Sequence, residues 1–292
     1  MSAAGAAVAA PRVDEARQAR RERLRLLVRT PTAVAGALIV VFWVLCAILG
    51  SDITPYSPIY YHTSGTFGHP SLAHLFGTDR IGRDVFSRVL AGSRDILTVA
   101  PLATLLAIVL GTTLGLITGY VRGVVDDLVS RAIDAVLALP LIIVAVTAIA
   151  ALGSKSNWTV TIVIGIVFTP IIARTVRAAV LAERDLDYVQ SARLRGEGNL
   201  YVMLVEILPN VMPLVLVEAT IRLGYAIFAV ASLTFLGFGI QLPSPDWAVQ
   251  VTDNYQYLDP DWWTVLFPAL AIASLVVAVN LVSDGIQQAY ER

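Results

Sequence analysis

Six uncharged apolar stretches constrain this chain more than any other feature of its sequence. Each is 18 to 26 residues long, and an α-helix needs about 20 apolar residues to cross the hydrocarbon core of a bilayer. The chain is 57% hydrophobic and 15% charged, whereas a typical soluble protein is about 45–50% apolar and about 25% charged. The sequence therefore predicts an all-α, polytopic membrane protein with six transmembrane helices. The stretches are 31–51, 96–121, 135–154, 156–173, 223–245 and 262–283.

The distribution of basic residues predicts the orientation. Six helices place both termini on the same side of the membrane. If that side is the cytosol, the inside segments carry fifteen arginines and the outside segments carry five basic residues. Cytoplasmic loops hold an excess of Lys and Arg, so we predict that both termini are cytosolic. The inside segments are then 1–31, 122–131, 174–206 and the residues after 283, and the outside segments are 52–95, 155 and 246–261.

These assignments divide the chain into five parts. The first part holds seven arginines, and it precedes an apolar run of span length. We therefore expect a cytosolic tail and not a cleaved signal peptide. The parts are a tail at 1–31, a first helix at 32–51, an extracytoplasmic loop at 52–95, a five-helix core at 96–284 and a cytosolic tail at 285–292.

A polar segment at 183–209 interrupts the apolar core. It carries five acidic residues, three arginines and two glycines, and a stretch this polar cannot lie in hydrocarbon. Its apolar residues fit stripes on short helices, with a break at Gly196 and Gly198. Two interpretations stay open at this point: a docking element for a soluble partner, or a solvated loop without one.

The extracytoplasmic loop offers two further features. Apolar residues at Ile81, Val85 and Val89 form a helical stripe opposite an arginine-rich face. That pattern predicts an amphipathic helix over 80–95 on the outer surface. The loop also contains all three histidines, but no cysteine or carboxylate accompanies them at ligand-like spacing, so we predict no metal site. The histidines are His62, His69 and His74.

Within the predicted helices, small and charged residues have different roles. Gly111, Gly115 and Gly119 are spaced by four, so they lie on one helix face where another backbone can approach closely. Glu218 and Arg222 are also spaced by four and can neutralise each other. They are either a structural ion pair near the membrane interface or a functional pair inside the bundle. On the cytosolic side, surface pairs are expected for Asp127–Arg131 and Arg131–Asp134.

Several kinds of chemistry have no signature in this chain. The sequence contains no G-x-x-x-x-G-K-[ST], no H-E-x-x-H and no G-x-S-x-G. We therefore predict no catalytic residues, and the chain is not expected to hydrolyse ATP. Its net charge of −1 argues against a nucleic-acid partner. Its single cysteine, Cys46, allows no disulfide framework.

The polar segment resembles the cytoplasmic coupling loop, called the EAA loop, of binding-protein-dependent ABC importers. The family pattern is E-A-A-x3-G-x9-I-x-L-P. Ala192, Gly196, Leu208 and Pro209 match it. The departures from the pattern are Gln190 for Glu, Ser191 for Ala and Glu206 at the Ile position, and Tyr188 before the pattern is similar to the peptide-importer branch.

A second segment, 76–88, resembles the G-T-D-x-x-G-R-D-x-x-S-R signature of the dipeptide, oligopeptide and nickel permeases. The resemblance extends over roughly residues 30 to 288, and the long loop after the first helix is similar to that of the C-type subunit of the pair. Arg122 in place of Gly and Val230 in place of an acidic residue are departures. The matching residues are Gly77, Thr78, Asp79, Gly82, Arg83, Asp84, Ser87 and Arg88.

The resemblance implies a type I importer (MetI-like) permease fold in a bacterial inner membrane. It implies half of a heterodimeric permease, completed by a related second permease, with a substrate-binding protein docking outside. Two ATPase subunits would bind ATP and magnesium, so this chain needs no cofactor, and its segment from Tyr188 to Gly196 would contact an ATPase. Small peptides are the first expectation for the cargo, with nickel, haem and other solutes as alternatives.

Two other classes of function remain as alternatives from the sequence. A self-contained secondary transporter would move its substrate without ATPase subunits. A membrane scaffold or enzyme would support no substrate flux. Co-purification with an ATPase subunit separates the importer from both.

Overall fold

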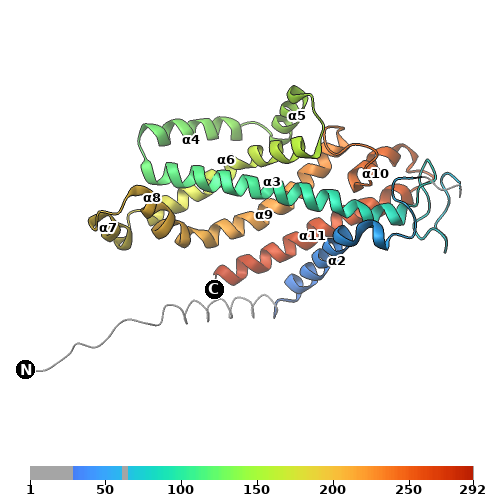
Figure 1. Cartoon of the computed structure of the whole chain (residues 1–292), viewed down its shortest axis with the longest axis horizontal. Helices are drawn as coiled ribbons and strands as arrows, with labels where there is room; N and C mark the ends of the chain where they lie inside the picture. The colour runs from blue at the N-terminus through green and yellow to red at the C-terminus, as the bar shows by residue number, and fades with distance from the viewer. Residues whose placement is uncertain (1–28, 61–64, 292) are drawn as a thin grey trace, which may run out of the picture.

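The computed structural model describes residues 29–60 and 65–291 of the chain. Most of the tail predicted at 1–31 lies outside the described residues, as do His62 and Arg292. Helices make up the regular structure, apart from an isolated bridge between Thr78 and Asp84. The molecule is elongated, and long helices run along its length (Figure 1). An all-α membrane fold is thereby confirmed.

Five helices of the described part are long and apolar enough to cross a membrane, and a sixth span exists if one bent helix pair is counted as a unit. That pair is α4 (Val124–Leu137) with α5 (Leu141–Leu152), and its two parts are bent by 94°. The five are α2 (Pro31–Ile53), α3 (Val85–Val121), α6 (Asn157–Glu183), α9 (Leu208–Phe235) and α11 (Trp263–Glu291).

The helix predicted over 135–154 is interrupted, although the bent pair that contains it remains a candidate sixth span. Pro140 lies between α4 and α5 and acts as the N-cap of α5. Proline lacks the amide hydrogen that a helix interior requires, and it disfavours helical geometry at the residue before it. α5 then runs for only 12 residues and ends at Gly153, which has a φ of 64°.

Several helix boundaries also differ from the uncharged windows, including the end of α6, which lies at Glu183 and not at residue 173. The separate surface helix expected over 80–95 is absent from the described chain, because α3 begins at Val85 and continues without interruption to Val121. The Asp84 side chain caps it by accepting from the Ser87 amide at 2.7 Å. α9 begins at Leu208, before the window at 223–245. The tail predicted at 285–292 is helical as far as Glu291, because it continues α11.

The centre of the fold is the contact between α3 and α6, which lie side by side (Figure 1). The three glycines of α3 face α6. A Cβ atom added at Gly111 would lie 2.6 Å from the Cβ of Ile172, and one added at Gly119 would lie 2.7 Å from the Cβ of Val180. The two backbones therefore approach as closely as side chains permit.

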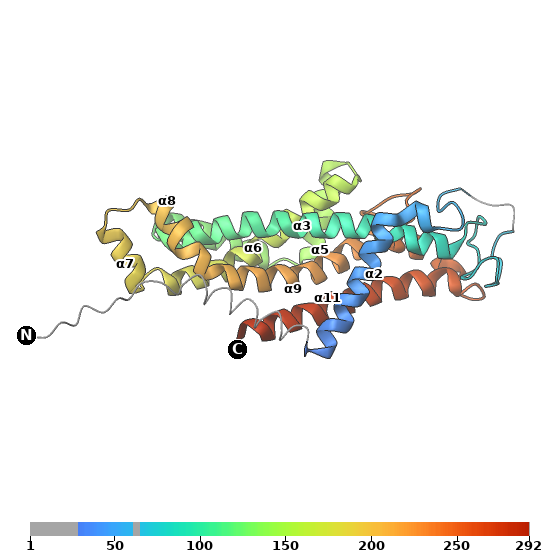
Figure 2. The same cartoon turned by 60° about the horizontal axis from the view of Figure 1, so that its bottom comes forward.

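α2 crosses in front of α3 and α11 (Figure 2) and packs against both. Gly36 permits the crossing, because a Cβ there would lie 2.6 Å from the Ala278 carbonyl oxygen. Farther along α2, the indole nitrogen of Trp43 donates to Ser274 at 2.9 Å. The Trp43 ring also meets Trp247 edge-on, with 4.6 Å between centroids.

The segments predicted on opposite sides of the membrane lie at opposite ends of the molecule (Figure 1). One end carries α7 (Asp187–Leu194) and α8 (Asn199–Tyr201). The other carries the loop before α3 together with α10 (Trp247–Asn254). The helix directions thus agree with the distribution of arginines.

Candidate functional site

The polar segment folds into two short helices joined by a glycine turn. α7 is followed by α8, by one turn of π-helix, η1 (Val202–Ile207), and then by α9. Gly196, with a φ of 81°, ends α7. Its amide donates to the Arg193 carbonyl at 2.9 Å, and the Glu197 amide donates to the Ala192 carbonyl at 3.2 Å. This pattern is a Schellman motif, which favours glycine at its left-handed position.

α7 has one buried face and one exposed face. Val189 and Ala192, three residues apart, are both 0% exposed and pack toward η1. Gln190 and Ser191 lie between them in sequence and point to solvent. Leu194, at the end of α7, is 89% exposed. A small buried residue at 192 thus lets α7 lie against η1, while its outer face stays free.

Hydrogen bonds tie this loop to the ends of α6 and α3. The Tyr188 hydroxyl donates to Glu183 at 2.7 Å. Burial, together with this bond, raises the pKa of Tyr188 to about 12, so the hydroxyl keeps its proton at neutral pH. Arg184 donates to the Tyr120 carbonyl at 2.7 Å, and the Tyr120 hydroxyl donates to Asn199 at 3.0 Å. The loop is therefore positioned by both central helices.

Leu208 and Pro209 form the start of α9. Pro209 supplies no amide hydrogen, and the π-helical turn η1 ends two residues before it. Arg195 closes the loop from the other side, because its guanidinium lies 3.1 Å from Glu206 in η1. Irregular turns of this kind are frequent at functional sites.

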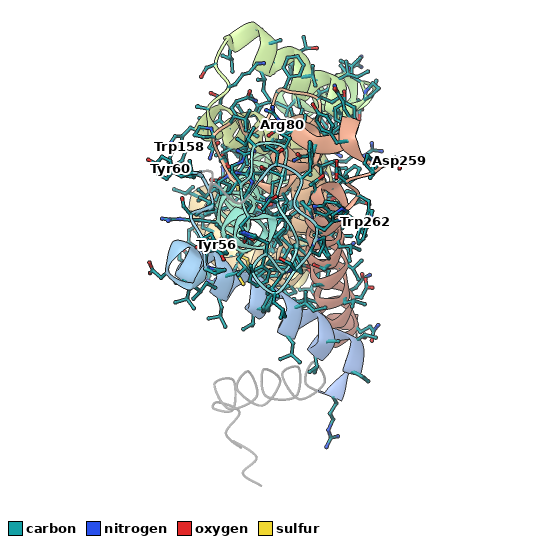
Figure 3. The ribbon with its side chains drawn as sticks, turned by 90° about the vertical axis from the view of Figure 1, so that its right-hand side faces the viewer. Tyr56, Tyr60, Arg80, Trp158, Asp259 and Trp262 are labelled. Carbon is teal, nitrogen blue, oxygen red and sulfur yellow. The ribbon has the colours of Figure 1, made fainter. Side chains whose placement is uncertain are left out.

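The segment 76–88 forms a buried network of charges at the opposite end. Asp79 accepts from the guanidinium of Arg83 at 2.6 Å and from its amide at 2.9 Å. Arg83 also reaches Asp253 of α10 at 2.8 Å, and Arg80 pairs with the same carboxylate at 2.7 Å. The bond to Asp253 raises the pKa of Arg80. Figure 3 shows this end, with Arg80 labelled.

Most of the arginine-rich face expected on the surface is thus turned inward, because Arg80, Arg83 and Arg88 find carboxylates or carbonyls there, whereas Arg94 stays exposed. Arg88 is 0% exposed and donates to the Pro58 carbonyl at 2.8 Å. Gly77 and Gly82 have φ values of 72° and 82°, which close the turns of this segment. The other buried members are Thr78, Asp79, Arg83, Asp84 and Ser87.

The two described histidines make contacts within this network. His74 Nδ1 lies 2.8 Å from Asp84 Oδ1, so Asp84 contacts a histidine while it caps α3. The His69 ring packs on Trp263, with 4.6 Å between centroids. Among the described residues, no group of three or more His, Cys, Asp or Glu side chains is arranged to hold a metal ion.

Glu218 and Arg222 form an ion pair within α9, at 2.6 Å between Arg222 Nε and Glu218 Oε1. Glu218 is 7% exposed, and the Arg222 guanidinium lies 5.2 Å from the centroid of the Tyr225 ring. The pair neutralises its own charge inside the helix. This mutual neutralisation explains why α9 continues through Glu218 and Arg222 although both side chains are charged.

The sequence did not predict two polar contacts. Asp126 of α4 accepts two hydrogen bonds from Arg177 of α6, at 2.6 and 2.7 Å. Of the residues in the surface pairs expected within α4, Asp134 instead lies 3.9 Å from Arg174 of α6. No spacing rule joins residues 51 positions apart, so the sequence carried no signal for this contact.

The second polar contact that the sequence did not predict is made by Asp246, the N-cap of α10. Its Oδ1 accepts from the amides of Ala248 and Val249, at 2.9 and 3.1 Å. The side chain is 0% exposed, and its Oδ2 has no hydrogen-bond partner among the described residues. Burial raises the pKa of Asp246 to about 7, and the nearby Asp95 carboxylate adds to that rise.

Comparisons with known proteins agree on one family. The family described as "Binding-protein-dependent transport system inner membrane component" matches residues 111–292. The dipeptide transport system permease protein DppC of Alkalihalophilus pseudofirmus is 37% identical over 271 residues, which cover 93% of this chain and 89% of the relative. The Escherichia coli protein of the same description is 39% identical over 90% of this chain and 89% of its own length.

A di/tripeptide transport system permease protein DppC of Pseudomonas aeruginosa is 36% identical over 89% of this chain and 87% of the relative. A solved chain of the MetNI methionine ABC transporter, in an inward-facing conformation, aligns with a TM-score of 0.56 and 20% identity. It covers 70% of this chain and 97% of that chain. At 20% identity, this similarity shows a shared fold.

Proposed function

The chain belongs to the family of binding-protein-dependent transport system inner membrane components, and on this premise we propose that it forms half of a translocation pathway for small peptides. It is a multi-pass permease of an ABC importer, and ATP is bound by separate ATPase subunits. We infer that a related second permease completes the pathway and that a peptide-binding protein delivers the substrate from outside. The descriptions of the relatives support peptides as the cargo.

The observation that carries the proposal is the construction of the loop at 183–209. Its outer face combines polar side chains with exposed apolar ones: Leu194 is 89% exposed and Leu200 is 66% exposed. Exposed apolar side chains beside polar ones suit a helix that docks into a groove of another protein. The loop is therefore proposed to bind an ATPase subunit.

The anchoring of the loop suits it to transmit force. Tyr188 and Arg184 join it to the ends of α6 and α3, and η1 leads directly into α9. A displacement of α7 therefore moves α6 and α9 as well. Coupling of this kind requires two discrete packings of the helices, between which ATP binding and hydrolysis shift the balance.

Substitutions at Gly196 can separate the effect of a larger side chain from the effect of backbone strain. A Cβ atom at this position would meet nothing within 4 Å, so a new side chain meets no obstacle. The remaining constraint is the backbone φ of 81°, which residues other than glycine rarely adopt. Asparagine tolerates this region, whereas the β-branched valine does not. Gly196→Val should thus disturb the end of α7, and Gly196→Asn should leave it unchanged.

The measurement is peptide-dependent ATPase activity of the reconstituted importer. We expect Gly196→Val to lower coupled activity severalfold while the two permeases still co-purify, with Gly196→Asn close to the unaltered protein. When the importer is purified, Leu194→Glu should reduce the amount of ATPase subunit that co-purifies. Leu72→Glu, at an outer position that is 99% exposed, should leave that amount unchanged. Full coupling in both Gly196→Val and Leu194→Glu would contradict the proposal.

A further inference from the structure

An apolar slot lies where α2 crosses the rest of the bundle. Its volume is about 530 Å³, which is within the range of about 300–1,000 Å³ found for small-molecule sites. Side chains of four helices form its walls. They are Val40, Val44, Ala47 and Ile48 of α2, Leu97, Thr98 and Pro101 of α3, Leu223 and Ile227 of α9, and Val279 of α11.

The slot has a cation beside it. Arg94 of α3 lines the slot and is exposed. Its neighbour Asp95 is engaged elsewhere, with Ser244 and Asn157. Within residues 29–60 and 65–291, no ion pair involves the Arg94 guanidinium. The slot therefore combines a hydrocarbon-like interior with an unneutralised positive charge.

The position of Arg94 along the bundle is that of a lipid head group. Asn157 donates to Asp95 at 3.3 Å, which places residues 94 and 95 level with the start of α6. There Trp158 is 68% exposed. Figure 3 shows Trp158 and Tyr60 on one side of this end and Trp262 on the other. Exposed aromatic residues of this kind mark the membrane–water interface.

The direction of α3 also supports the placement of Arg94 at the level of the lipid head groups. α3 begins at the outer end, and the Cα–Cβ bonds of a helix tilt toward its N-terminus. The Cα–Cβ bond of Arg94 thus tilts toward the outer surface, and the long, flexible arginine side chain can carry its charge to the head-group level. Pro101 lies seven residues farther along α3 and forms the deep part of the slot, about 10 Å below Arg94 at the rise of an α-helix.

We propose that this slot binds an anionic phospholipid of the outer leaflet, with its phosphate on Arg94 and an acyl chain between α2 and α3. The guanidinium of arginine matches the geometry of phosphate oxygens. The walls supply the apolar surface that one acyl chain requires. A lipid held there joins α2 to the core, and this role is independent of the proposed peptide transport.

The probe is phosphatidylglycerol, titrated into the purified importer in detergent and followed by native mass spectrometry. Arg94→Gln should weaken its binding about fivefold, because one basic residue near an anionic head group contributes about 1 kcal/mol. Binding of diacylglycerol, which has the same chains and no phosphate, should not respond to Arg94→Gln. Ala47→Trp, which fills the slot, should reduce binding of both lipids.

Leu38→Trp is the matched control, because Leu38 lies on α2 at 66% exposure and does not line the slot. It should leave both lipids bound as before. Equal phosphatidylglycerol binding in Arg94→Gln and the unaltered protein overturns the proposal. It is also overturned if Ala47→Trp leaves lipid binding intact and instead prevents recovery of the second permease, since the slot is then a protein interface.

Discussion

A single methyl group added at Gly115 should force α3 and α6 apart. The new Cβ would lie 2.7 Å from the Cβ of Val176 and 2.8 Å from the carbonyl oxygen of Ala173. Carbon atoms that are not bonded prefer a separation of about 3.5–4.0 Å, so the two helices must move by roughly 1 Å. The obstacle at Ala173 is backbone and cannot rotate away.

Two opposing effects set the size of the change. Overpacking of a close contact costs about 1–3 kcal/mol, and a rigid backbone obstacle places Gly115→Ala at the upper end of that range. Alanine gains about 1 kcal/mol over glycine in a helix. The net expectation is a loss of about 2 kcal/mol. If Gly115 faced lipid, only the gain would remain and the sign would reverse.

The assay is the apparent thermal midpoint of the purified protein in detergent, at a fixed scan rate because such unfolding is often irreversible. Gly224→Ala is the control, since its nearest obstacle is the Oδ1 of Asn280 at 2.7 Å, the end of a side chain that can turn. We expect a lower midpoint for Gly115→Ala and an unchanged or slightly raised midpoint for Gly224→Ala, where the gain in helix propensity remains. A midpoint for Gly115→Ala at or above that of the unaltered protein would refute the packing described for α3 and α6.

Three other changes test the polar contacts. Asp246 has a pKa raised by burial to about 7, so the folded protein should lose stability as pH rises from about 4 to about 7, by at most about 1.4 kcal/mol per unit. Asp246→Asn, still an N-cap, should flatten this dependence in melting curves at pH 5 and 8. Asp253→Asn breaks a pair with buried Arg83 and should expose the outer loop to protease more than Arg80→Gln would; equal sensitivity of the two would count against the network. Arg177→Lys should speed amide exchange in α4 and not in α7, because lysine cannot keep both bonds to Asp126.

Hydropathy located the helices well and placed some of their ends poorly. The window at 96–121 began eleven residues after the observed start of α3 at Val85, because charged residues bounded the window. Two of those charges are tolerated since they find partners: Arg88 donates to the Pro58 carbonyl, and Asp95 accepts from Asn157. The same holds for Glu218 and Arg222 in α9. A rule that counts charges without pairing them ends helices too early.

Some of the differences could have been anticipated. Pro140 stands inside the window at 135–154, and a proline in a helical pattern predicts a break at the preceding residue. The turn at Gly196 was indicated by the same kind of reasoning and is present. Local chemistry determines both features, so one sequence is sufficient to predict them.

Contacts between segments that are distant in the sequence could not be predicted from local sequence patterns. Arg80 and Asp253 are 173 residues apart, and nothing near either residue identifies the other. The i, i+4 rule covers only neighbours on one helix, so it gave no partner for Asp126, whose partner Arg177 is on α6. Pairings of this type depend on how helices are arranged in space, which the charge pattern of a single chain does not specify.

The two ends of the molecule differ in a way that bears on force transmission. At the outer end, Asp79, Arg83 and Asp253 lock the loop before α3 to α10 through buried charges, which are costly to separate. At the other end, α7 and α8 are attached by hydrogen bonds at partly buried positions. We therefore propose that a force applied to α7 meets less resistance near the loop than at the outer end. The absence of a side chain at Gly115 lets α6 pack directly against α3, so we propose that these two helices move together, with the outer network as their fixed point.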